Sequence, residues 1–125
     1  NGTAIMDLLE VFKDSEDLVE FSAGEVIIME GKEGDHMYVV MKGEVTISLK
    51  DTVLATVGPG EMVGEMALIN SDRRSATVTA RTNSQLAVID QASFESLLRY
   101  VPDFTAHVMN VLASRLQNAY EIIEH

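Results

Sequence analysis

The stretch 64–80, GEMALINSDRRSATVTA, holds a carboxylate and an arginine at a spacing that suits a small phosphorylated ligand. Glu65 follows a glycine, and Arg74 lies nine positions later. A guanidinium presents a planar set of donors that fits a phosphate diester, whereas a carboxylate accepts hydrogen bonds from the hydroxyl groups of a sugar. These two side chains would therefore bind opposite ends of one ligand. The alternative is that Glu65 and Arg74 pair with each other across a tight loop and that Gly64 serves only the turn.

Two short elements would position this pair. The segment GEMALIN predicts a single helical turn, and the unpaired N–H groups at the start of a helix form an anion site. A strand beginning at Arg74 would give this residue the same parity as Val78 and Ala80, so its guanidinium would point inward. A buried arginine is costly without an anionic partner, and a phosphate would supply one. Ser75 adds a hydroxyl donor for the same phosphate, while Arg73 is expected to face solvent.

The surrounding sequence predicts short strands. Between Leu18 and Asp90, apolar runs alternate with glycine, aspartate and lysine. In the clearest run Val45, Ile47 and Leu49 alternate with polar residues, as a strand with one buried face requires. Several short strands with glycine turns favour a β-roll of the jelly-roll type. The expected fold class is therefore mainly β with flanking helices.

Helical periodicity appears at both ends of the chain. Residues 4–12, AIMDLLEVF, have the apolar spacing of one helix face. After Asp90, the segment ASFESLLRY should end at the Val101–Pro102 step, because a residue before proline is biased out of the helical region. Asp103 suits a helix cap or first-turn acid. Beyond it, one apolar stripe is predicted, formed by Phe104, Val108, Val111, Leu112, Leu116, Ala119, Ile122 and Ile123.

We expect one domain over residues 1–125. Its parts are a helical segment at 1–16, a β-roll at 17–90 and C-terminal helices at 91–125. The last helical turns extend beyond the point where a compact roll would easily cover them. Three readings remain open: a core helix that packs back on the roll, a mobile lid, and a dimer seam.

The composition disfavours nucleic-acid-binding, secreted and membrane-spanning proteins. Twenty acidic against nine basic side chains give a net charge of −11, which disfavours attraction to nucleic acid or anionic lipid. The sequence has no cysteine, no signal peptide pattern and no apolar run long enough to span a membrane. We therefore expect a cytoplasmic protein that neither inserts into membranes nor contacts nucleic acid directly. A small anion can still bind, because charges beyond roughly 8 Å are screened at physiological salt.

The stretch 64–80 resembles the phosphate-binding cassette of the cyclic nucleotide-binding domain family. Members of this family include protein kinase A regulatory subunits, cyclic-nucleotide-regulated channels and the bacterial catabolite activator protein. The segment FSAGEVIIMEGKEGDHMYVVMKGEVTISL is similar to the family's first strands, and GPGEMVGEMALI to the entry to its cassette, here residues 64–78. The resemblance implies a module that binds cAMP, with cGMP as the alternative ligand, and acts as a ligand-switched sensor without any further cofactor.

The resemblance also implies roles for particular residues. Arg74 and Ser75 would bind the cyclic phosphate together with the backbone amides of Met66 and Ala67. Glu65 would bind the ribose 2′-hydroxyl, and Gly64 would let the backbone approach the sugar. The positions that match the ribose and base wall are Ile47, Leu54 and Val63.

Recognition of the base departs from the family pattern. In the catabolite activator protein the last helix supplies hydroxyl groups to adenine, whereas Ala119 and Tyr120 occupy the matching positions here. Asn118 or Tyr120 would have to substitute. Family members that prefer cGMP often carry threonine at the position of Ser75, so the serine favours cAMP.

The residues disfavour three rival functions. A metal enzyme of the cupin kind needs clustered histidines, but the chain's three histidines fall in different elements, and no nucleophile motif is present. A DNA-binding regulator would need a recognition helix, and none follows the last predicted helix. A degenerate scaffold that has lost its ligand is disfavoured because both Glu65 and Arg74 are retained. We therefore predict a non-enzymatic module, with the effector domain or partner protein left open.

Overall fold

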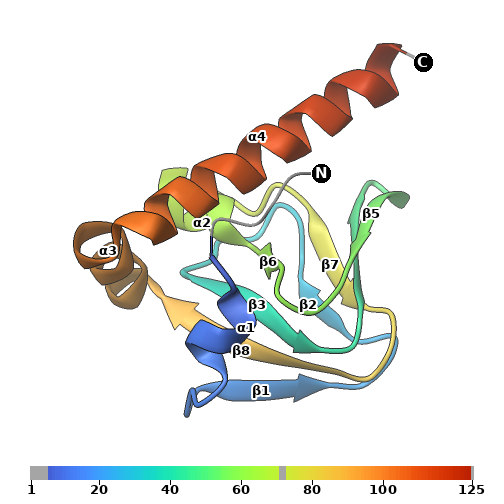
Figure 1. Ribbon diagram of the computed structural model, residues 1–125. Coiled ribbons are helices and arrows are strands. Elements are labelled where there is room, and N and C mark those ends of the chain that lie inside the picture. The colour runs from blue at the N-terminus through green and yellow to red at the C-terminus, as the bar shows by residue number, and fades with distance from the viewer. Residues whose placement is uncertain (1–5, 71–72, 125) are drawn as a thin grey trace. The chain divides into compact units, whose positions relative to one another are not determined.

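The computed structural model describes residues 6–70 and 73–124, and the chain divides into two compact units. One unit spans residues 8–91, and the other combines residues 92–125 with the first seven residues. Within the first unit, helix α1 (Leu8–Phe12) precedes eight strands, and helix α2 (Glu65–Asn70) lies between the sixth and seventh strands (Figure 1). The strands are β1 (Leu18–Phe21), β2 (Val26–Ile28), β3 (His36–Lys42), β4 (Val45–Leu49), β5 (Thr52–Val57), β6 (Met62–Val63), β7 (Thr77–Ala80) and β8 (Ser84–Asp90).

These strands form two four-stranded antiparallel sheets. Their orders are β1-β8-β3-β6 and β2-β7-β4-β5, so sequential neighbours are often separated, as in a roll. Strand β8 runs beside both β1 and β3, with Gln85 opposite Glu20 on one side and Lys42 on the other. This architecture confirms the expected fold class, a β-roll with flanking helices.

The core of the roll is aliphatic and draws on both sheets. Its buried side chains are Ile28, Val40, Val45, Val57, Val63, Val78 and Leu86. The β-branched residues in this set suit the pleated surface of a strand, where they pack well against neighbouring strands. These side chains come from strands of both sheets and form one apolar cluster.

The tight turn between β4 and β5 uses an unexpected pair of residues. Lys50 and Asp51 both have positive φ angles, of 50° and 69°, a region that is costly for residues other than glycine. The register also shifts between Ile47 and Ser48, which marks a bulge near the end of β4. The alternation at residues 44–50 predicts β4 but not the strained turn that follows it.

The second unit contains helices α3 (Gln91–Tyr100), except for its first residue, and α4 (Pro102–Glu124). The rings of Phe94 and Phe104 meet edge to face, with centroids 5.8 Å apart, and link the two helices. Asp103 lies in the first turn of α4, where a carboxylate stabilises the helix dipole, as expected.

Three local expectations need correction. The N-terminal helix begins at Leu8, and residues 4 and 5 of the predicted helix lie outside the described residues. Strand β7 begins at Thr77, so Arg74 precedes the strand. The predicted stripe of α4 is buried at Phe104 and Val108, but Leu116 is 55% exposed, and the side chains of Ile122 and Ile123 are outside the described set.

Candidate functional site

The guanidinium of Arg74 is held by two backbone carbonyl groups. Nη1 donates to Gly64 O at 2.9 Å, and Nη2 donates to His36 O at 2.7 Å, in a partly buried position. A Cβ atom at position 34 would overlap Nε and Cζ of Arg74, so a glycine stands where this side chain crosses the backbone. The hydrogen bonds that the structure gives to this guanidinium thus go to carbonyl oxygens, and they satisfy part of its donor set without a phosphate.

The backbone of Arg74 is fixed as well. Its amide donates to Lys32 O at 2.7 Å, and its carbonyl accepts a bond from the amide of Gly31 at 2.9 Å. The side chain of Arg73 donates from Nη1 to Gly31 O at 2.9 Å. Hydrogen bonds to the turn at residues 31 and 32 therefore fix the segment that carries both arginines. They explain how the backbone of Arg74 is positioned although this residue does not belong to a strand.

Glu65 and Gly64 lie at the entry to α2. Glu65 is the first residue of this helix and is only 4% exposed. Gly64 has a φ of +82°, and a Cβ there would approach Ile28 Cδ1 to 2.8 Å and Arg74 Nη1 to 2.9 Å. Only glycine accommodates both the conformation and the close approach. The contact between Nη1 and Gly64 O brings the arginine next to the turn that presents Glu65.

Other predicted phosphate ligands lie nearby along the chain. Met66 and Ala67 are in the first turn of α2, where N–H groups lack acceptors within the helix. Ser75 is exposed, directly after Arg74. Residues 71 and 72 of the predicted cassette lie outside the described residues.

The three predicted wall residues have different surroundings. Ile47 is half-buried on β4 and packs against the core of the roll. Leu54 is 45% exposed on β5, which leaves an apolar side chain available to a ligand. Val63 is 1% exposed and belongs to the core itself. On α4, in the other unit, Asn118 and Tyr120 are both exposed.

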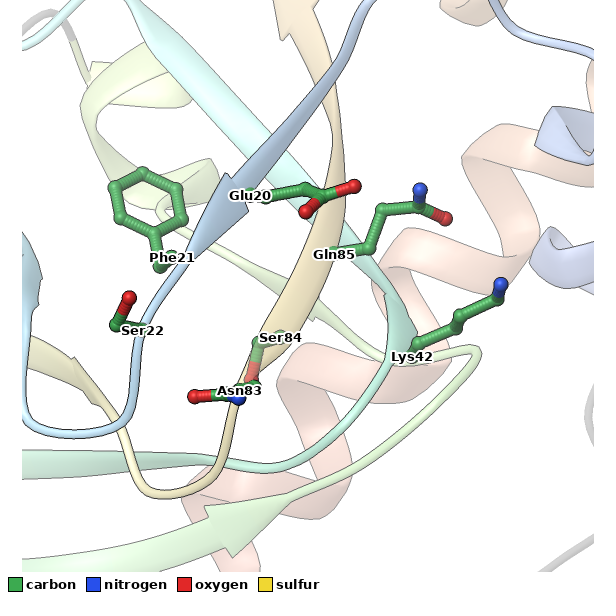
Figure 2. Close-up of a pocket in the computed structure, with 7 residues that line it drawn as sticks. All are labelled: Glu20, Phe21, Ser22, Lys42, Asn83, Ser84 and Gln85. Atoms are coloured by element: carbon green, nitrogen blue, oxygen red, sulfur yellow. The ribbon is translucent and has the colours of Figure 1, made fainter.

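A polar pocket of about 280 Å³ lies elsewhere on the roll (Figure 2). Glu20, Gln85 and Lys42 reach out from β1, β8 and β3 in one cross-strand row. Its other lining residues are Phe21, Ser22, Asn83 and Ser84. The polar groups of Asn83 and Ser84 are engaged with the protein, because Asn83 Oδ1 accepts from Ala23 N and Ser84 Oγ donates to Thr82 O. This pocket shares no residue with the predicted cassette.

Sequence reasoning missed His36, which contacts Arg74, and Glu30, which links the turn between β4 and β5 to β7. His36 takes part through its backbone carbonyl, which carries no signal in the sequence. Glu30 accepts hydrogen bonds from Lys50 N and from Thr77 Oγ1, contacts made across 20 and 47 positions of the chain. The glycines at 31 and 34 were the sequence signal that could have pointed to this region. They mark places where the backbone turns or where another part of the chain comes close to it.

Residues 6–70 and 73–124 also bear on metal binding and on membrane insertion. No group of three or more histidine, aspartate or glutamate side chains there could hold a metal ion. No helix in that part of the chain has the length and apolar character needed to cross a membrane.

Comparison with known proteins adds independent evidence. The model of the cyclic nucleotide-binding domain matches residues 18–100. A cAMP-dependent protein kinase regulatory subunit from Eremothecium gossypii is 40% identical over 77 residues, which is 62% of this chain and 17% of that protein. The Thermus thermophilus catabolite activator protein superposes with a TM-score of 0.75 at 28% identity, over 86% of this chain and 53% of that one.

The EAL enzyme Bd1971 is similar in both of its nucleotide-bound forms. Its cGMP-bound form superposes with a TM-score of 0.65 at 32% identity, over 83% of this chain and 29% of that one. Its cAMP-bound form gives a TM-score of 0.64 at 33% identity, over 86% and 30%. The chain spans between 7% and 17% of the length of three curated relatives that it matches.

The matched region runs from the first strand to the end of α3 and contains the arginine held against the turn before α2. Its eight antiparallel strands in two sheets are those of the related structures. This chain belongs to the cyclic nucleotide-binding domain family.

Proposed function

We propose that this chain binds a 3′,5′-cyclic nucleotide, cAMP in preference to cGMP, and works as a ligand-switched regulatory module. The observation that carries the proposal is the 2.9 Å hydrogen bond from Arg74 Nη1 to Gly64 O. It brings the best phosphate-binding side chain of the cassette against the turn that precedes the buried Glu65. A ligand with an anionic phosphate fused to a ribose fits that pair.

In this proposal Arg74 binds the cyclic phosphate with the N–H groups that the two carbonyl bonds leave over. The amides of Met66 and Ala67 and the hydroxyl of Ser75 complete the phosphate site. Glu65 accepts a bond from the ribose 2′-hydroxyl, while Gly64 keeps the backbone close to the sugar. Ile47 and Leu54 supply apolar contact to the ribose and base, and Val63 supports them from the core.

The preference for cAMP rests on Ser75, the position at which family members that prefer cGMP often carry threonine. Relatives with this fold include an enzyme with both a cAMP-bound and a cGMP-bound structure, so titrations with both nucleotides are needed. Asn118 and Tyr120, both exposed on α4, are the proposed partners of the base.

The regulatory step is proposed for α4. Its exposed apolar side chains at Met109, Leu116 and Tyr120 provide a surface that can cover the ligand as a lid or pair with a second copy of the chain. Amide hydrogen exchange at residues 115–121 distinguishes the lid, which requires slower exchange when cAMP saturates the protein. No change in exchange there would remove the lid from the proposal.

Calorimetric titration with cAMP and cGMP tests the binding site itself. Arg74→Ala removes charge-assisted hydrogen bonds of about 1.5 to 3 kcal/mol each, so cAMP affinity should fall at least about tenfold while the fold is retained. Arg81→Ala is the matched control, because Arg81 is a cation of the same roll that pairs with Glu44. Glu65→Gln should weaken cAMP more than its 2′-deoxy analogue.

Unchanged affinity in a folded Arg74→Ala protein would contradict the phosphate role, and equal losses for cAMP and the 2′-deoxy analogue would contradict the ribose role. The alternative function is a degenerate scaffold of the same fold, which binds neither nucleotide. The two functions are separated by the first titration of the unaltered chain.

A further inference from the structure

Glu30 joins three segments that are distant in sequence. Its carboxylate accepts hydrogen bonds from the amide of Lys50, at 3.1 Å to Oε1 and 3.2 Å to Oε2. The hydroxyl of Thr77 donates to Oε1 at 3.0 Å, and the amide of Glu30 donates back to that hydroxyl at 3.1 Å. One partly buried glutamate thus connects the turn after β2, the turn between β4 and β5, and the first residue of β7.

Each of these segments leads to a part of the proposed ligand site. The β4–β5 hairpin carries Ile47 and Leu54, the proposed apolar wall. The residue after Glu30 is Gly31, whose amide bonds to Arg74 O. Thr77 follows Arg74 by three positions. Glu30 is therefore a polar link between the hairpin and the segment that carries the proposed phosphate-binding arginine.

Because Glu30 is negatively charged, the direction in which its removal changes nucleotide affinity tests this link. A carboxylate near an anion site repels the ligand, so removing it should raise affinity if charge were its only influence. Its hydrogen bonds instead hold Lys50, a non-glycine residue with a φ of 50°, in a conformation that costs energy. Removing them should release both the hairpin turn and the turn next to Arg74.

We propose that Glu30 is a positioning residue for nucleotide binding, which couples the β4–β5 hairpin to Arg74 through Lys50 and Thr77. This inference rests on the proposed function for its effect on affinity, but the coupling itself exists in the protein without ligand. The two can therefore be measured separately.

The experiment compares Glu30→Ala and Glu30→Gln with the unaltered chain. NMR hydrogen exchange follows the amides of Lys50 and Arg74 in ligand-free protein, and calorimetry gives the cAMP affinity. Glu25→Ala is the matched control, because it removes the same charge and a similar bond, from Ser22 N to Glu25 Oε1 at 2.6 Å, at the turn between β1 and β2. Thr77→Val tests the link from its other end.

In Glu30→Ala, both amides should exchange faster and cAMP affinity should fall about three- to tenfold. Glu30→Gln should lie closer to the unaltered chain, because its amide oxygen can still accept from Lys50. In Thr77→Val the Arg74 amide should exchange faster, which tests the link even if Glu30→Ala does not fold. Glu25→Ala should change none of these quantities.

Faster exchange at Lys50 with unchanged exchange at Arg74 would overturn the coupling, since Glu30 would then serve the hairpin alone. Higher cAMP affinity in Glu30→Gln would overturn the positioning role in favour of a charge effect. If the unaltered chain binds neither cAMP nor cGMP, the proposed function fails, and the exchange rates at Arg74 still decide whether the link exists.

Discussion

Replacing Arg74 by methionine should destabilise the ligand-free protein. Sequence reasoning treats an inward arginine without an anion as a cost, and removal of such a charge is often neutral or stabilising. The structure gives the opposite sign, because the guanidinium donates to Gly64 O and His36 O. Methionine keeps most of the apolar stem and removes these two bonds, so the sign of the change in stability separates the two views.

The size of the effect follows from the geometry. A hydrogen bond from a charged donor contributes about 1.5 to 3 kcal/mol when buried. The Arg74 bonds are only partly buried, and water can re-solvate the freed carbonyl groups, so we take roughly half of that value for each bond. The expected loss in the free energy of unfolding is about 1.5 to 3 kcal/mol. With a urea dependence of about 1 to 3 kcal/mol per molar, the unfolding midpoint should fall by about 1 M.

Urea unfolding in buffer free of phosphate, sulfate and nucleotide measures this loss without an anion in the site. Arg81→Met is the control, because it makes the same chemical change at an exposed ion pair in which Nη1 lies 2.6 Å from Glu44 Oε1. Such pairs contribute about 0 to 1 kcal/mol, and both variants raise the net negative charge equally. An Arg74→Met protein as stable as Arg81→Met, or more stable than the unaltered chain, would refute the role of the two carbonyl groups.

Two more predictions concern His107 and the glycine turns. His107 is 6% exposed on α4, its Nδ1 has no hydrogen-bond partner among the described residues, and burial lowers its pKa below 6.5. As pH falls, the unfolded chain therefore binds a proton at His107 before the folded chain does, so the free energy of unfolding should fall as pH drops below 6.5. His107→Gln should remove this part of the pH dependence. Profiles of unfolding free energy against pH that have the same slope in both proteins would contradict the prediction. Gly24 and Gly43 have φ angles of +94° and +87°, but a Cβ at 24 meets nothing within 4 Å, whereas one at 43 lies 2.6 Å from Ser84 Oγ and overlaps Asn83 O. Gly24→Ala should cost about 1 to 2 kcal/mol and Gly43→Ala clearly more in urea unfolding, and equal losses would show that the second contact relaxes.

The strands of the roll could be predicted because their signal is local. Residues 44–50 alternate between apolar and polar side chains, and Val45 is fully buried, but Leu49 is 40% exposed beyond the register shift between Ile47 and Ser48. The change to a helical period after Asp90 and the proline at 102 likewise gave both C-terminal helices. Patterns of this kind depend on a few neighbouring residues, so they can be recognised without knowledge of tertiary contacts.

The arrangement around Arg74 could not be predicted in the same way. Its side-chain partners are backbone carbonyl groups at positions 36 and 64, and any residue type supplies a carbonyl. The inward direction of Arg74 was predicted from its parity within a strand, and this basis was wrong because β7 begins only at Thr77. The positive φ angles of Lys50 and Asp51 could not be predicted either, since lysine rarely adopts them and aspartate marks them less strongly than glycine does.

The carbonyl bonds of Arg74 also bear on how a chain with a net charge of −11 would bind the anion of the proposed function. An exposed arginine loses up to about 2 kcal/mol of side-chain entropy when a ligand fixes it. Here Gly64 O and His36 O already restrict the guanidinium, so a phosphate meets donors whose ordering has been supplied by folding. The distant acidic groups slow the approach of the anion, but their effect at the site is screened by salt. In the proposed function, affinity is therefore set by the preformed geometry of a few local donors, and net charge acts mainly on the association rate.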